Sequence, residues 1–348
     1  MALPGRISLC LLALAHLAAP ALPAEEPLFD LQKLADGVYA ALARPRNPIN
    51  CNAVVIEYDE GVLVVDTHSR PSSARGLIDQ IKTLTDKPVR YAVNTHFHWD
   101  HAQGNHAYPV AFPRQVTIVS SEATRQSLES MGLERVKAQL EEAPNTIAAL
   151  QKSLLVEKDA AARARIEDEI RQQEDYRKEL IGLELTLPDL TFDKSLILHR
   201  SGRDIVLLFL GRGHTSGDVV VYLPKEKVVA TGDLLHGWMP FMADGYPPEW
   251  VATLDQVAKL DFTQIVGGHG GVKPRTHLTT FRNYLSDLID ETRKARGRGE
   301  TLEKAKASVA TALKARYAEG MGGETRFDSS IGNNVAKVFG DLEAGSYP

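Results

Sequence analysis

Short runs of apolar and β-branched residues, separated by polar turns, fill two parts of the chain, up to residue 120 and again from residue 191. Runs of this kind predict β-strands. The expected strands cover residues 29–34, 38–42, 52–58, 61–65, 89–95 and 116–119 in the first part, and 191–192, 195–198, 204–210, 219–223, 228–230 and 264–266 in the second. Apolar side chains at helical spacing over residues 72–84 predict a helix between the strands. This arrangement indicates an α/β fold.

Two other segments predict helices. From 121 to 183 charged residues and alanines dominate, and the pattern predicts an insertion of two or three long helices broken near Pro144. This insertion is expected to pack on the domain; a lid over a site and an arm that joins subunits are the alternatives. Residues 275–339 predict C-terminal helices. Since no repeat or low-complexity linker interrupts the chain, residues 28–348 are expected to form a single domain.

The first 24 residues have the features of a secretory leader. Arg6 precedes an apolar run over residues 7–19, and small residues follow it. The run is too short to span a bilayer as a mature helix. Cleavage is expected after Ala24 or Ala21, with export to a periplasm or to the outside, and an uncleaved anchor is the alternative. No later segment is apolar enough to span a membrane, so no stable membrane insertion is expected after cleavage.

Charge and cysteine content narrow the function classes. The formal net charge is −5, and it becomes −6 when the leader with Arg6 is removed. A mildly acidic chain offers no electrostatic basis for binding nucleic acid. The mature chain keeps one cysteine, Cys51, which cannot form an internal disulfide. With 43% hydrophobic residues, the protein is expected to be stabilised by an ordinary core.

A dense group of potential metal ligands follows the strand predicted over 89–95. His96, His98, Asp100 and His101 lie within six consecutive residues. Successive side chains of an extended segment point to opposite faces, so His96 and His98 point the same way. A turn after them directs Asp100 and His101 to a second, neighbouring position. The spacing therefore favours two adjacent metal ions and predicts further ligands downstream.

Three later strand ends carry such residues. His214 lies in a glycine-rich loop, Asp233 follows the strand predicted over 228–230, and His269 is flanked by glycines. Glycines allow the backbone to come close to a metal or a substrate. Asp66, at another strand end, could form a turn or a helix cap, or it could orient a metal-bound histidine.

Together these residues resemble the metallo-β-lactamase superfamily in type, order and strand-end context, roughly from residue 28 to residue 271. The resemblance implies a four-layer αββα sandwich with two zinc ions. In that family pattern His96, His98 and His214 would bind the first zinc, Asp100, His101 and His269 the second, and Asp233 both, with Asp66 supporting the site from behind.

The resemblance also implies a reaction. Zinc lowers the pKa of bound water to about 7, and the resulting hydroxide would attack a small carbonyl substrate, a β-lactam, a lactone or an ester. Asp100 would act as the catalytic residue by orienting the nucleophile and handling its proton. Trp99, His236 and Trp238 are adjacent to ligand positions and would line a substrate pocket or pack in the core.

Several different functions remain open at this point. Many antibiotic-hydrolysing members carry Cys or Ser at the position of Asp233. An aspartate at this position is similar to the pattern of glyoxalase II and lactonases. Asp218 stands where glyoxalase II-like sequences usually have His, which argues against a thioesterase. The chain could also be an iron-dependent redox member of the superfamily, or a zinc-stabilised binding protein without activity. It has no room for the extra nuclease domain of the RNA-processing members.

Overall fold

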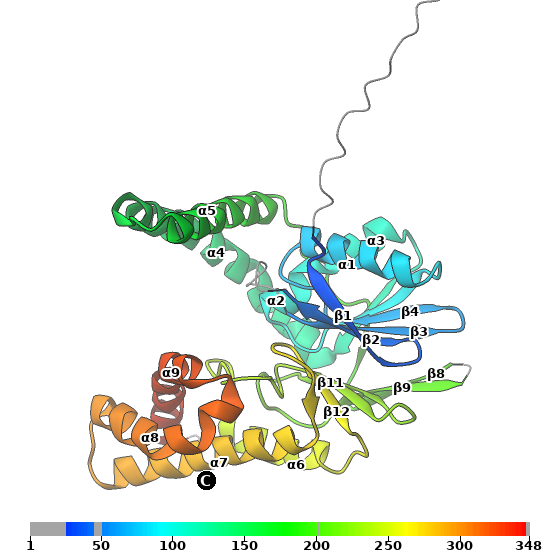
Figure 1. Ribbon diagram of the computed structural model, residues 1–348. Helices are drawn as coiled ribbons and strands as arrows, with labels where there is room; N and C mark the ends of the chain where they lie inside the picture. Colours follow the sequence, from blue (N-terminus) through cyan, green and yellow to red (C-terminus); the bar gives the residue numbers. More distant parts are fainter. Residues whose placement is uncertain (1–25, 45–50, 201, 346–348) are drawn as a thin grey trace, which may run out of the picture.

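Two mixed β-sheets lie face to face, with helices on both outer sides (Figure 1). The computed structural model describes residues 26–44, 51–200 and 202–345. The predicted leader lies outside these ranges. The layers are those of the αββα sandwich, with a helical C-terminus, so the predicted fold class is confirmed.

Each sheet follows the chain in order, so each half of the sandwich is formed by one continuous half of the sequence. The first sheet contains β1 (Phe29–Ala35), β2 (Val38–Ala43), β3 (Ala53–Tyr58), β4 (Gly61–Val65), β5 (Val89–Val93), β6 (Thr117–Ser121) and β7 (Leu190–Phe192). The second contains β8 (Ser195–Arg200), β9 (Arg203–Phe209), β10 (Val219–Leu223), β11 (Val228–Gly232), β12 (Gln264–Gly267) and β13 (Lys273–Pro274). The pairs β4–β5 and β11–β12 are parallel.

Alternation along the strands separates the layers. In β3, Val54 and Ile56 pack in the core between the sheets, whereas Val55 packs on the outer side against the first helices. In β10, Val221 faces the core between the sheets and Val220 faces the C-terminal helices. Successive side chains of a strand point to opposite faces, so central strands that are covered on both sides, such as β4 and β10, are almost wholly apolar.

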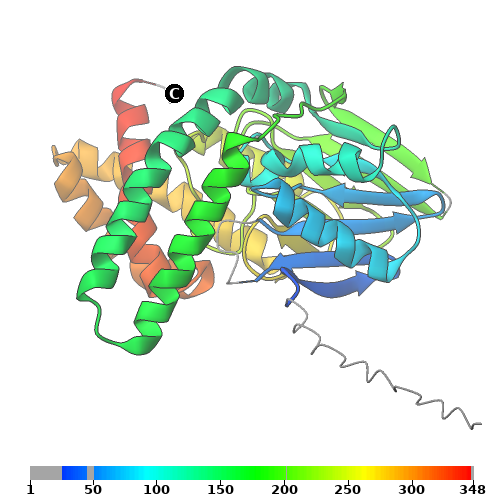
Figure 2. The same ribbon diagram turned by 90° about the horizontal axis from the view of Figure 1, so that it is seen from above.

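Helices cover the outer faces (Figures 1 and 2). The first sheet is covered by α1 (Pro71–Leu84) and α3 (Ala107–Ala111). The 3₁₀ turn η1 (Gln103–His106) contacts both of these helices and the short helix α2 (Trp99–Ala102). Below the second sheet lie α6 (Pro247–Val257) and α7 (Thr276–Gly297), with α8 (Leu302–Tyr317), the turn η2 (Glu319–Met321) and α9 (Glu324–Glu343) packed on α7. The helix α6 was not expected from the sequence.

The insertion forms a pair of helices that projects from the sandwich (Figure 2). It consists of α4 (Glu122–Val156) and α5 (Ala160–Ile181), which pack against each other. The predicted break near Pro144 is wrong, since α4 continues through this residue and ends at Val156. Pro144 is exposed, so water can reach the Leu140 carbonyl that the missing proline N–H leaves without its donor. Within the described ranges, no helix is long and apolar enough to cross a membrane.

Gly104 is the point where the loop after β5 touches the loop after β4. Its N–H donates to the His68 carbonyl (2.9 Å), and an added Cβ would lie 1.8 Å from the Thr67 carbonyl oxygen. The residue is therefore required for close backbone contact.

We expect Gly104→Ala to lower the free energy of unfolding by about 3 kcal/mol, because two backbone segments must separate. Gly340→Ala in α9 is the control, since its Cβ would meet no atom within 4 Å and it should be neutral or slightly stabilising. Urea unfolding of both variants checks this, and equal midpoints would contradict the packing argument.

Candidate metal centre

The predicted ligands lie where the ends of the two sheets meet. His96 and His98 are in the loop after β5, Asp100 and His101 are in α2, His214 is between β9 and β10, Asp233 follows β11, and His269 follows β12. Backbone hydrogen bonds join the sheets at this point, from Val219 N–H to the Thr95 carbonyl and from Asn52 N–H to the Gly268 carbonyl, both 2.7 Å. The junction of the sheets therefore determines how the ligand loops approach one another.

All seven side chains predicted as ligands converge. The ligand atoms of His96, His98 and His214 lie within 4.8 Å of one another, and those of Asp100, His101 and His269 form a second group of the same size. Asp233 lies between the groups. Its Oδ1 is 3.4 Å from His101 Nε2, and its Oδ2 is 3.4 Å from His269 Nε2 and 3.7 Å from His214 Nε2. The arrangement has the form of two adjacent ion sites that share one carboxylate.

Several of these buried atoms have no hydrogen-bond partner among the described residues. They include His96 Nε2, His101 Nε2 and Asp233 Oδ1, and the ligand atoms of these three residues lie within 4.8 Å of one another. Leaving a buried polar atom unpaired costs about 1–3 kcal/mol, so three together indicate a missing partner. Imidazole nitrogens and carboxylate oxygens are the ligands that zinc takes, so the residues present fit a metal ion.

Asp66 holds this cluster from behind, at the end of β4. Its Oδ2 accepts from His101 Nδ1 (2.8 Å) and from Thr95 Oγ1 (2.9 Å), while its Oδ1 accepts from Thr95 N–H (2.8 Å). Thr95 Oγ1 in turn lies 3.0 Å from His96 Nδ1. Both imidazoles are thereby held with Nε2 directed into the cluster. Asp66 adopts a left-handed backbone (φ 65°), which brings its carboxylate under the cluster.

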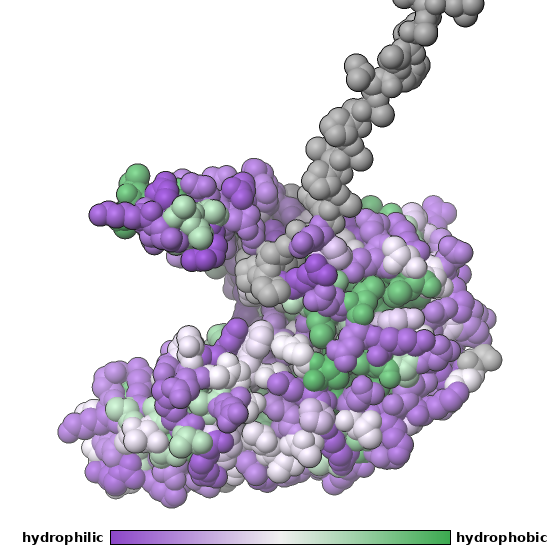
Figure 3. Space-filling view, viewed as in Figure 1, coloured by the Kyte–Doolittle hydropathy of each residue, from purple (hydrophilic) through white to green (hydrophobic). Residues whose placement is uncertain are grey.

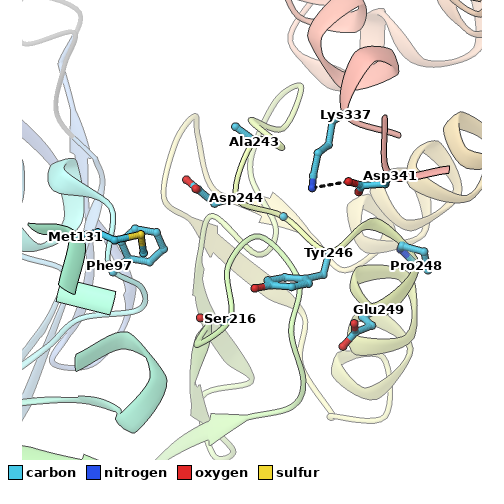
Figure 4. A pocket seen from close by; sticks show the side chains of 11 residues that line it. Phe97, Met131, Ser216, Ala243, Asp244, Tyr246, Pro248, Glu249, Lys337 and Asp341 are labelled. Carbon is cyan, nitrogen blue, oxygen red and sulfur yellow. Dashed lines mark hydrogen bonds and ion pairs between the residues drawn. The ribbon is translucent and has the colours of Figure 1, made fainter. Parts of the chain in front are cut away.

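A second support comes from Asp244, which the sequence did not single out. Its Oδ2 accepts from His98 Nε2 (2.8 Å), leaving His98 Nδ1 to face His214 Nε2 at 2.9 Å. Arg135 of α4 donates to both Asp244 oxygens (2.9 and 3.0 Å). The hydrogen bond from His98 and the charge of Arg135 hold the pKa of Asp244 well below its ordinary value. Figure 4 shows Asp244 directed toward the side where Phe97 lies.

No local signal could have revealed Asp244. It lies 146 residues from His98 in the loop between β11 and α6, and an Asp-Gly pair in a loop normally indicates only a turn. The contact between Arg135 and Asp244 also depends on where the inserted helix α4 lies relative to this loop.

Charges within the cluster balance one another. Burial opposes the charged form of His269, but Asp233 and Asp100 raise its pKa to about 9. Burial likewise opposes the charge on Asp100, but His101 and His269 lower its pKa well below the usual range. The buried carboxylates thus require nearby positive charge, which protonated imidazoles or metal ions can supply.

A cavity of about 870 Å³ opens from the cluster. The three residues predicted to line a substrate pocket, Trp99, His236 and Trp238, all lie on its wall together with His98, Asp100, Asp233 and His269. Trp99 also packs against Tyr176 of α5, at 6.0 Å between ring centroids. His236 is fully buried, its Nε2 is 3.6 Å from Asp233 Oδ2, and burial lowers its pKa to about 4. Figure 3 shows the molecule hollowed between the α4–α5 pair and the C-terminal helices, and Arg135 of α4 and several residues of α9 line the cavity.

Asp218, His68 and His199 lie outside the cluster. Asp218 accepts hydrogen bonds from Thr215 N–H and Thr215 Oγ1 (2.6 Å to the latter), so it closes the loop that carries His214. His68 is buried against the Cys51 carbonyl (3.1 Å). His199 is exposed and pairs with Asp204 (2.9 Å).

The fold and this cluster define a metal-binding sandwich with its site at the junction of two sheets. The family model of the metallo-beta-lactamase superfamily matches residues 46–269. The chain belongs to the metallo-beta-lactamase superfamily, and it is a hydrolase of that superfamily.

The chain is similar in sequence both to a metallo-beta-lactamase and to an alkylsulfatase. It is 22% identical over 278 residues to the metallo-beta-lactamase type 2 of Elizabethkingia meningoseptica, which covers 77% of this chain and 87% of the relative. It is 24% identical over 230 residues to the linear primary-alkylsulfatase of a Pseudomonas species, covering 62% of this chain and 40% of that protein.

Solved structures with the same fold divide in the same way. A metallo-beta-lactamase from Pontibacter korlensis superposes with a TM-score of 0.53 at 19% identity, over 74% of this chain and 99% of the other. An inverting sec-alkylsulfatase from a Pseudomonas species superposes with a TM-score of 0.62 at 17% identity, over 92% of this chain and 51% of the other. The chain thus spans about half of that sulfatase.

Gly268 brings the backbone after β12 against the cluster, so it gives one test of the site. An added Cβ would lie 2.1 Å from Asp233 Oδ1 and 2.6 Å from His101 Cε1. We expect Gly268→Ala to lose most of its bound metal, measured by plasma mass spectrometry, because Asp233 and His101 must move. Gly271→Ala, whose Cβ meets no atom within 4 Å, should keep its metal. Equal metal content in the two variants would refute the assigned position of the centre.

Asp244→Asn gives a second test. The amide keeps the shape of the side chain but loses the charge that orients His98, so we expect metal affinity to fall about 10- to 100-fold. Competition against a chromophoric chelator measures this affinity. Asp255→Asn is the matched control, since Asp255 forms an ion pair with Arg282 (3.0 Å) away from the cluster. An unchanged affinity in Asp244→Asn would show that His98 needs no such support.

Proposed function

We propose that this protein is an exported dinuclear zinc hydrolase of small carbonyl substrates, a β-lactam, a lactone or an ester. The observation that carries the proposal is the convergence of two ligand groups around the shared carboxylate of Asp233. In this proposal His96, His98 and His214 hold one ion, and Asp100, His101 and His269 hold the other. Structural zinc sites are closed and hold one ion, whereas this cluster forms part of a cavity wall, which favours catalysis over a purely structural role.

Two bound ions would lower the pKa of a water molecule and polarise the substrate carbonyl. The protein supplies the geometry for this chemistry. Asp66 and Asp244 fix the imidazoles of His101 and His98, each through a 2.8 Å hydrogen bond. Because the rings are held before substrate arrives, little reorganisation is needed during the reaction.

Asp100 is the residue proposed to handle the proton. Its side chain lies on the cavity wall, and its Oδ2 is 3.1 Å from His269 Nε2. With Oδ2 facing the other ligands of the second ion, the remaining carboxylate oxygen can orient an attacking water and accept its proton. His236 and Trp238, on the same wall, are proposed to contact the substrate.

Hydrolysis of a sulfate ester is the second candidate. The observation in its favour is that the sec-alkylsulfatase fold matches 92% of this chain, whereas the metallo-beta-lactamase from Pontibacter korlensis matches 74%. Assays on both substrate classes separate the two candidates.

A glyoxalase II-like thioesterase is less favoured, because Asp218 closes a loop away from the cluster. Metal analysis tests for an iron-dependent redox protein.

The location of the protein and its partners are also part of the proposal. Residues 1–24 are proposed as a cleaved leader, with a periplasmic or secreted mature protein. The pair α4 and α5 is long, charged and projecting, and it is the part through which an oligomer could form. A small-molecule substrate is the partner that the cavity of about 870 Å³ accommodates.

We expect the purified mature protein to contain about two zinc ions per chain. His98→Ala should lose metal and at least about 1,000-fold in activity, since it removes a ligand and its link to Asp244. His199→Ala, an exposed histidine, should behave as wild type. Full activity in metal-free His98→Ala would refute the mechanism, and stoichiometric iron would favour redox chemistry over hydrolysis.

The substrate class is tested with chromogenic cephalosporin, lactones, aryl esters, thioesters, phosphodiesters and alkyl sulfates. Turnover of the first three supports the carbonyl proposal. Turnover of alkyl sulfates alone would favour the second candidate, and turnover of phosphodiesters alone would refute both.

A further inference from the structure

One wall of the cavity is formed by the C-terminal helix α9, which lies beyond the residues matched by the family model. The helix presents a polar face to the cavity through Arg326, Ser329, Ser330, Asn333 and Lys337. Apart from the neighbours Ser329 and Ser330, these positions follow one another at intervals of three or four residues, so they lie on one side of the helix. The opposite side, with Phe327, Ile331 and Val335, is buried in the core. Because the core fixes the orientation of α9, its polar face forms a defined part of the cavity wall.

Three arginine or lysine side chains line the cavity, and two of them have carboxylate partners. Arg135 pairs with Asp244 (2.9 Å) and Lys337 pairs with Asp341 (3.0 Å; Figure 4). Arg326 differs, because no carboxylate of the described residues lies within 4.0 Å of its guanidinium.

The acids nearest to Arg326 on α9 face another partner. Glu324 and Asp328 both pair with Lys314 of α8, at 3.3 and 2.8 Å. Among the arginines and lysines that the structure describes on the cavity wall, Arg326 is thus the one without a paired carboxylate. A ligand in the cavity can reach it.

The orientation of this arginine is set by stacking. Its Cζ lies 3.9 Å from the ring centroid of Trp238, and Trp238 is stacked on His269, with 5.3 Å between centroids and 16° between planes. A guanidinium stacked on an aromatic face keeps its N–H groups free at the edge. These N–H groups match the two oxygens of an oxyanion.

The loop that carries Trp238 is itself fixed. Met239 N–H donates to the Met321 carbonyl (3.0 Å), and a Cβ at Gly322 would lie 2.7 Å from Trp238 Cβ. His277 Nε2 donates to the His236 carbonyl (2.7 Å). The stack from His269 through Trp238 to Arg326 is therefore held by the C-terminal helices at a defined distance from the metal cluster.

We propose that Arg326 binds an oxyanion group on the substrate, at the far end of the molecule from the bond that is cleaved. This inference rests on the proposed hydrolase function and narrows its substrates to anionic ones. The substrate would place its reactive group at the cluster, its apolar middle against Phe241 and the edge of the stacked Trp238 ring, and a carboxylate or sulfate at Arg326. Phe241 is 55% exposed at the rim of the cavity, as expected of a contact for such an apolar segment.

Thiols that bind metal through sulfur test this without turnover. The probes are mercaptopropionate, mercaptohexanoate and mercaptooctanoate, each paired with its amide, and the corresponding mercaptoalkanesulfonates. Calorimetry on the metal-loaded protein measures the affinity ratio of acid to amide. We expect a ratio of about 10 to 100 at the chain length that spans the cavity, as for a hydrogen bond to a charged group. Carboxylates and sulfonates compared at that length show which oxyanion fits better.

The ratio should fall to about 1 in Arg326→Gln, with unchanged metal content and thermal stability, and Arg326→Lys should keep part of it. Arg296→Gln is the matched control, since Arg296 lies over the Phe339 ring (5.7 Å) and does not line this cavity. An acid-to-amide ratio that survives in Arg326→Gln, or that is 1 in the wild type, overturns the role of Arg326 but leaves the hydrolase proposal intact. Failure of every thiol to bind the metal-loaded protein would overturn both.

Discussion

Buried imidazole and carboxylate groups lie against one another at the junction of the two sheets, where each has lost its hydration. Asp233 and His101 show the constraint most clearly, since both are buried, 3.4 Å apart, and each leaves an atom without a hydrogen bond. Such a cluster is stable only when positive charge neutralises the carboxylates and when each ring is fixed. Asp66 and Thr95 fix rings from the first sheet, and Gly268 lets the backbone of the second sheet approach. The sandwich thus positions the ligands, and the buried carboxylates require positive charge close to them.

Much of this was accessible from the sequence because the relevant signals are local. Short apolar runs predicted the strands, the family resemblance implied their arrangement in two sheets, and the ligand residues lie directly at strand ends, where backbone direction limits their positions. His96 and His98 could be paired from their spacing alone. The long helices of the insertion were also evident from composition, but the break near Pro144 was wrong. The exposed face of α4 tolerates the proline, and exposure depends on which side of the helix packs, which the local sequence does not determine.

The parts that escaped sequence reasoning depend on contacts between distant segments. Asp244 acquires its role from His98 and from Arg135, which lie in a loop of the first sheet and in the insertion. Arg326 acquires its role from Trp238, which lies before α6 in the chain, and from the absence of a carboxylate near it in the described structure. Neither residue belongs to a motif, and an arginine or an aspartate on a polar helix or turn normally indicates only a solvated surface. Such residues become recognisable only when the helices are placed beside the sheets.

This division also explains why family membership leaves the substrate open. The proposed metal ligands all lie within residues 46–269, the part matched by the family model, whereas α9 lies wholly after it. The reacting groups are therefore supplied by the shared sandwich, and one wall of the cavity is supplied by helices that the match does not include. A metal centre can act on any carbonyl or sulfate that reaches it, so selectivity must come from the walls that admit the substrate. In this protein, Arg135 of α4 and Arg326 of α9 line the same cavity. The residues that determine specificity therefore lie outside the motif that determines the chemistry.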